Sequence, residues 1–187
     1  MKDMGFGERW IRWISKCITS ASISVLVNGS LTPCFDLARG LRQGCSLSPL
    51  LFNIVVEALH LMIEKACEVG LFCGFSVGKG VDKVAISHLQ FADDLLMFCS
   101  AATGEIRNVK RVFRLFEIAS GLKLNLNKCS LFGINIDVDS LKCWASVVGC
   151  SVGTLPSEYL GLPLGPKRNS AALWEPIVRK MHDALAS

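Results

Sequence analysis

Apolar residues recur at helical spacing in several parts of the chain and predict one-sided helices. Ser48 suits the N-cap and Pro49 the first position of the longest of them, and Gly121 suits the C-cap of the third. Helices are therefore predicted near 7–20, 48–64, 104–121, 140–148 and from 171 onward. The buried stripe predicted for the longest helix consists of Leu51, Ile54, Val55, Ala58, Leu59 and Met62.

Shorter runs rich in β-branched residues predict strands. The pair Asn28-Gly29 predicts a tight turn between two of these runs. Strands are predicted near 23–27, 31–37, 83–91, 95–99 and 123–136, with a glycine-rich link over 70–80 and a further hairpin around Tyr159. This mixture of helices and antiparallel hairpins predicts an α+β fold.

Two adjacent carboxylates, Asp93 and Asp94, fall at the predicted tip of the hairpin between 83–91 and 95–99. Aspartate is depleted in strands and two like charges repel, so a site for hard divalent cations would explain the pair. Asp-Asp is also a common turn pair. The tetrapeptide around it leaves a metal site and a solvated turn equally open.

A glycine-punctuated loop runs from Arg39 into the helix predicted after Ser48. The backbone amides of Gly40 and Gly44 can approach a ligand closely, and the start of the helix adds positive potential for an anion such as a triphosphate. Most Ser-Pro helix starts bind nothing, so the loop alone is weak evidence.

Together, the loop and the carboxylate pair resemble the reverse transcriptase domain of non-LTR (LINE-type) retrotransposons. In that family a loop and helix like Arg39 to Phe52 precede a box like Phe91 to Asp94. Four more blocks match in the same order, namely Phe6 with Trp10 to Ile14, Ser24 to Gly29, Phe116 to Lys128 and Tyr159 to Gly165. The resemblance covers almost the whole chain.

The resemblance implies a partial right-hand polymerase palm, with antiparallel hairpins packed on helices. Residues 1–155 would form a fingers and palm portion, and 156–187 the primer-grip hairpin and the start of the thumb. The implied activity is that of an RNA-directed DNA polymerase that transfers nucleotides with two metal ions. The alternative is a non-catalytic remnant of a retroelement that binds nucleic acid weakly.

The resemblance also implies roles for particular residues. Asp93 and Asp94 would be catalytic and would bind Mg²⁺, for which Mn²⁺ is a possible substitute. Gln43, Gly44 and Phe91 would lie against the incoming nucleotide and the template. Lys128 is a candidate general acid, with Lys123 as its rival. The primer grip would comprise Tyr159, Leu160 and Gly161, although a role in packing alone is equally open.

This chain departs from the family pattern in two places. Cys45-Ser46 stands where the family usually has Asp-Pro, which removes a charge and a rigid turn residue. The other essential carboxylate of the family lies on a strand ahead of the first helix, where this chain begins, and Asp3 does not replace it.

The resemblance also implies the partners, which are an RNA template, a DNA primer, deoxynucleoside triphosphates, and N-terminal and thumb segments of a parent polyprotein. Alone, the chain is expected to be inactive.

Composition adds little to this. The chain of 187 residues is 51% hydrophobic, but no run approaches about eighteen uninterrupted apolar residues, so no membrane partner is expected. Nine cysteines without a CxxC pair favour free thiols in a reducing, intracellular compartment, either nucleus or cytoplasm. The basic face predicted for the third helix is interpreted as solvated rather than phosphate-binding; it comprises Arg107, Lys110, Arg111 and Arg114.

Overall fold

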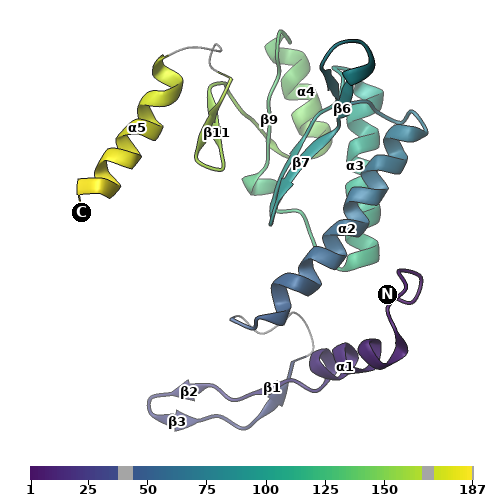
Figure 1. Cartoon of the computed structure of the whole chain (residues 1–187), viewed down its shortest axis with the longest axis vertical. Coiled ribbons are helices and arrows are strands. Elements are labelled where there is room, and N and C mark those ends of the chain that lie inside the picture. Colours follow the sequence, from purple (N-terminus) through teal and green to yellow (C-terminus); the bar gives the residue numbers. More distant parts are fainter. Residues whose placement is uncertain (38–43, 166–170, 187) are drawn as a thin grey trace. The chain divides into compact units, whose positions relative to one another are not determined.

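The computed structural model describes residues 1–37, 44–165 and 171–186 (Figure 1). The described residues divide into two compact units, Met1–Val56 and Glu57–Ser187. Five of the six two-stranded sheets in the described parts are antiparallel, and the sixth is parallel. The α+β fold class is therefore confirmed, with helices and small antiparallel sheets.

The first unit contains helix α1 (Glu8–Thr19) and a long hairpin. In the hairpin, β1 (Ser22–Ile23) pairs with β4 (Phe35–Asp36), and β2 (Leu26–Val27) pairs with β3 (Ser30–Leu31). The predicted turn is confirmed, because Asn28 and Gly29 both have positive φ, +49° and +81°, as a type I′ turn requires. The strands are shorter than predicted, and between the two ladders the Thr32 hydroxyl accepts the Val25 N–H at 3.0 Å.

Helix α2 (Leu47–Glu68) begins one residue before the predicted N-cap Ser48 and continues four residues beyond the predicted end. Its most buried positions are Leu51, Leu59, Ile63 and Ala66. The predicted stripe was wrong at Ala58, which is exposed, and missed Ile63, which is fully buried. By length and composition α2 could cross a membrane, a criterion that core helices of soluble proteins also meet.

Two successive hairpins follow α2 in the second unit. Strand β5 (Phe75–Val77) pairs with β6 (Val84–Ile86) around the 3₁₀ turn η1 (Gly80–Asp82), and β7 (His88–Phe91) pairs with β8 (Asp94–Met97). The single strand predicted over 83–91 was therefore wrong, because it breaks at Ser87 and its halves pair with different partners. The predicted link over 70–80 contains β5.

Glycine at position 74 permits the β5–β6 pairing. A Cβ atom at this position would lie 1.9 Å from the carbonyl oxygen of Ile86, the last residue of β6. Only a residue without a side chain allows the two backbones to approach so closely.

Helices α3 (Thr103–Ser120) and α4 (Val138–Val148) contact each other (Figure 1). Gly121 ends α3 with φ +74°, which confirms the predicted C-cap. The Asp137 side chain caps α4 by accepting the Ser140 N–H at 2.8 Å. The core side chains of the two helices are Ile106, Val109, Val112, Phe116, Leu141 and Ala145.

The segment predicted as a strand over 123–136 was mostly wrong. It forms the 3₁₀ turn η2 (Leu126–Lys128) and the short strand β9 (Ser130–Leu131), which pairs in parallel with β10 (Ser151–Val152). The predicted last hairpin is confirmed as β11 (Ser157–Tyr159) and β12 (Leu162–Leu164), and the last helix as α5 (Ala171–Ala186).

Candidate functional site

The carboxylate pair lies at the tip of the β7–β8 hairpin, as the sequence predicts. Phe91 and Asp94 form the last pair of the ladder, so Ala92 and Asp93 make the two-residue turn. Ala92 has φ +50°, which is rare for a residue with a side chain and costs about 1–3 kcal/mol. The Gln90 side-chain amide supports this turn by donating to the Ala92 carbonyl at 3.4 Å. Strain of this kind is concentrated at functional sites.

Both carboxylates face solvent. Asp93 and Asp94 are exposed, and no hydrogen bond or ion pair joins either side chain to another described residue. Mg²⁺ is commonly bound by one or two carboxylates together with substrate phosphates and water, so the donor atoms fit a hard divalent ion. Within the described ranges no group of three or more His, Cys, Asp or Glu side chains could hold a metal. The structure therefore shows two exposed carboxylates whose oxygens suit a hard divalent ion, without a third such side chain beside them in the described ranges.

One face of β7 is open beside the carboxylates. Exposure alternates along the strand, with His88 and Gln90 half-buried and Leu89 and Phe91 exposed. The Phe91 side chain is 63% exposed although it is large and apolar. A ligand next to Asp93 and Asp94 could therefore contact this aromatic ring.

The last hairpin touches the carboxylate hairpin. The Tyr159 hydroxyl donates to the Leu89 carbonyl on β7 across a long 3.5 Å contact. Leu160 and Gly161 form the β11–β12 turn, both with positive φ (+52° and +78°), and the Leu160 side chain is exposed. The structure thus joins a predicted primer-grip residue to the strand that ends in Phe91.

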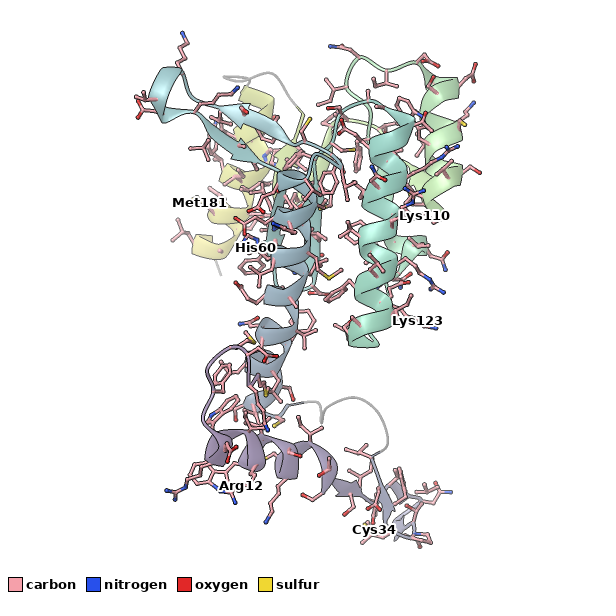
Figure 2. The ribbon with its side chains drawn as sticks, turned by 90° about the vertical axis from the view of Figure 1, so that its right-hand side faces the viewer. Arg12, Cys34, His60, Lys110, Lys123 and Met181 are labelled. Carbon is pink, nitrogen blue, oxygen red and sulfur yellow. The ribbon has the colours of Figure 1, made fainter. Side chains whose placement is uncertain are left out.

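Other predicted site residues are not brought to the carboxylates by any described contact. Lys128 is exposed at the end of η2, and Lys123 lies exposed after α3 (Figure 2). Gln43 lies outside the described residues. Gly44 belongs to the first compact unit and has φ +80°, a conformation that glycine adopts without strain.

The basic face of α3 lies at the surface, and three of its four residues contact neighbouring groups of the chain. Lys110 lies on the α4 side of α3 (Figure 2) and donates to the carbonyl of Val147 in the last turn of α4. Arg111 donates to the side chain of Asn108, and Arg114 pairs with the carboxylate of Glu117 at 3.1 Å. All four basic residues are exposed, which agrees with the interpretation of the face as solvated, and three of them also make contacts within the chain.

Sequence reasoning missed a carboxylate that organises this region, Glu105 in the first turn of α3. It accepts the backbone N–H of Cys73 at 3.1 Å and that of Ser100 at 3.0 Å. Desolvation raises the pKa of Glu105, but these hydrogen bonds outweigh it, and the net pKa is lowered. The only local signal was an acidic residue at a helix start, which usually just complements the helix dipole.

Glu117, near the end of α3, has a comparable structural role. Its carboxylate accepts the Leu124 N–H at 2.9 Å and binds Arg114. The hydrogen bond from Leu124, followed by that from Arg114, lowers the pKa of Glu117. This contact fixes the chain where it leaves α3.

Comparison with known proteins gives consistent results. A protein-family model described as reverse transcriptase (RNA-dependent DNA polymerase) matches residues 1–164. The Pol polyprotein of the type-2 retrotransposable element R2DM of Drosophila melanogaster is 29% identical over 134 residues, covering 72% of this chain and 12% of that protein. A Pol polyprotein of the type-1 retrotransposable element R2 of Popillia japonica is 28% identical over 130 residues, covering 70% and 20%.

An uncharacterized mitochondrial protein of Arabidopsis thaliana is 39% identical over 69 residues, which cover 37% of this chain and 55% of that protein. The present chain thus spans only a small part of the two retrotransposon polyproteins that it resembles.

Proposed function

The chain belongs to the reverse transcriptase (RNA-dependent DNA polymerase) family, and from that premise we propose that it forms part of the polymerase domain of a retrotransposon polyprotein, with the palm at its centre. The polyprotein would copy RNA into DNA. The observation that carries the proposal is the exposed Asp93-Asp94 pair on a strained hairpin turn, inside the region that matches the family.

The chemistry proposed for the site is nucleotidyl transfer. Reverse transcriptases generally use divalent metals, and we assign Mg²⁺ to Asp93 and Asp94, with Mn²⁺ as a substitute. Bound ions would lower the pKa of the primer 3′-hydroxyl and neutralise the leaving pyrophosphate. The protein contributes the two-residue turn Ala92-Asp93, and Asp94 follows it as the first residue of β8, so that both carboxylates lie at the end of one ladder.

The neighbouring residues are assigned to binding. Phe91 would lie against the nucleotide and template, since its ring is exposed beside the carboxylates. Tyr159, Leu160 and Gly161 would support the primer, which the contact from Tyr159 to β7 favours. Gln43 and Gly44 would lie against the incoming nucleotide, and Lys128, with Lys123 as its rival, would protonate pyrophosphate.

The partners follow from the proposed reaction: an RNA template, a DNA primer, deoxynucleoside triphosphates and the remaining polyprotein. We assign residues 1–155 to fingers and palm and 156–187 to the primer grip and the start of the thumb. The cysteine-rich sequence without a CxxC pair favours a reducing, intracellular compartment.

Substitution in a polyprotein that contains these residues tests the proposal. Asp93→Asn keeps the size of the side chain but removes a negative charge from the site. Primer extension on poly(rA)/oligo(dT) with Mg²⁺ should fall by on the order of a hundredfold or more, comparable to the loss of a main electrostatic stabiliser. Asp139→Asn is the matched control, because its side chain is 97% exposed on α4 and lies 3.9 Å from Lys142. Equal extension by the two variants would exclude a catalytic role for Asp93.

The second candidate is a non-catalytic remnant with weak nucleic-acid binding. It is favoured by one observation, that the two carboxylates have no third metal-binding neighbour in the described part of the chain. A parent polyprotein without activity before any substitution, but with retained binding to an RNA–DNA duplex, would support this alternative.

A further inference from the structure

Two histidines from distant parts of the chain meet at the base of the carboxylate hairpin. The Nδ1 atom of His60 on α2 lies 3.0 Å from the Nε2 atom of His88, the first residue of β7, and Figure 2 labels His60 on its helix. The ring centroids are 5.1 Å apart with an interplanar angle of 46°. The second ring nitrogen of His88 lies 2.9 Å from the Ser87 hydroxyl.

The geometry requires one proton between the two facing nitrogens. A neutral imidazole has one N–H and one acceptor nitrogen, so the contact forms when either ring supplies the proton. If both rings are charged, two N–H groups face each other and the hydrogen bond is lost. The Ser87 hydroxyl can donate or accept, so it accommodates either tautomer of His88.

The surroundings of His88 favour its neutral form. Desolvation lowers the pKa of His88, the nearby His60 lowers it further, and Glu64 opposes them by raising it. His60 and Glu64 both lie on α2. On β8 the residue that pairs with His88 is Met97, which has no titratable group. A neutral His88 can complete the hydrogen bond with His60.

The pair is placed to affect the carboxylates without touching them. His88 lies three residues before Phe91 on β7, which is about 10 Å at the usual rise of a strand. His60 projects from α2, so the contact ties the base of the hairpin to a long helix. The tip that carries Asp93 and Asp94 is therefore oriented in part from its base.

We propose that His60 and His88 form a positioning pair that anchors the hairpin to α2. When both imidazole rings carry a charge their hydrogen bond is lost, so nucleotide incorporation should fall in mildly acidic solution. The activity half of this inference rests on the proposed function, whereas the anchoring half concerns only the fold. The pKa of His88 is lowered in the folded state. The contribution of neutral His88 to the stability of the fold is therefore present above the ordinary histidine pKa, and it is lost as pH falls through the pKa that His88 has in the folded state.

Glutamine variants test the anchoring half in the 187-residue chain. His60→Gln and His88→Gln retain a donor and an acceptor but cannot titrate. His182→Gln is the matched control, since His182 is the third histidine and is exposed on α5. Urea midpoints at about pH 7.5 and about pH 6 should differ for the wild type and the control, and differ less for both pair variants. Equal pH dependence in all four proteins would overturn the inference.

The activity half is tested in the active polyprotein with the same three variants. The ratio of incorporation at about pH 6 to that at about pH 7.5 should rise by about two- to tenfold in the pair variants, the factor expected for one hydrogen bond. It should not change in His182→Gln. An unchanged ratio in the pair variants, with a changed urea profile, would reject the coupling to catalysis and leave the anchor. If the proposed function is wrong, a different result will show it, because Asp93→Asn will then retain full activity.

Discussion

Replacement of Glu105 tests whether one carboxylate holds the segments that flank two successive hairpins, β5–β6 and β7–β8. Cys73 precedes β5 closely and Ser100 follows β8, and both donate their backbone N–H to Glu105. Hydrogen bonds to a charged group contribute about 1.5–3 kcal/mol each. Glu105 is half-buried, so water can replace part of these hydrogen bonds in a variant. We therefore expect the free energy of unfolding to fall by about 2 kcal/mol for Glu105→Ala and by about 1 kcal/mol for Glu105→Gln, because Gln keeps an acceptor oxygen.

Urea unfolding of the 187-residue chain measures these losses. With a slope near 2 kcal/mol per molar urea, the midpoint should fall by about 1 M for Glu105→Ala and about 0.5 M for Glu105→Gln. The control is Glu175→Gln, because Glu175 is exposed on α5 and pairs with Arg179 at 3.6 Å. Its midpoint should stay within about 0.25 M of the wild type, as expected for an exposed pair.

The pH dependence has a definite sign. Since the pKa of Glu105 is lowered in the folded state, its stabilising contribution is present above the ordinary value of 4.5 and is lost as pH falls through the folded value. The difference between the wild type and Glu105→Gln should therefore be largest near neutral pH and shrink below 4.5. A Gln variant with the wild-type midpoint at neutral pH would refute the reasoning.

Three further outcomes are expected. Gly74→Ala should destabilise the chain by more than about 2 kcal/mol in urea melts, since the added Cβ meets the Ile86 carbonyl. Gly104→Ala in α3, where the added Cβ meets open space, should be neutral or stabilising by up to about 1 kcal/mol. Similar urea midpoints for the two variants would contradict this expectation. Tyr159→Phe should change stability by less than about 1 kcal/mol, because its 3.5 Å contact is long, so a larger drop in the melt would show a stronger bond. A polypeptide of these 187 residues should not extend a primer with Mg²⁺ or Mn²⁺, since its described residues offer two carboxylates without a third ligand, and clear incorporation would reject that expectation.

Sequence alone determined the features that depend on neighbouring residues. The Asn28-Gly29 turn, the end of α3 at Gly121 and the position of Asp93 at a hairpin tip follow from backbone preferences that act over a few residues. Family membership was also accessible, because the matching blocks keep their order along the chain. These predictions required no knowledge of which distant segments touch.

Tertiary structure decided the features that depend on such contacts. The break at Ser87 arises because β6 and β7 pair with different strands, and the parallel pairing of Ser130 with Ser151 replaced a predicted strand. Periodicity gives the face of a residue but not its partner. The same reason explains why Glu105 and the pair of His60 and His88 were missed: each links segments about thirty residues apart, and only folding brings their polar atoms within hydrogen-bonding distance.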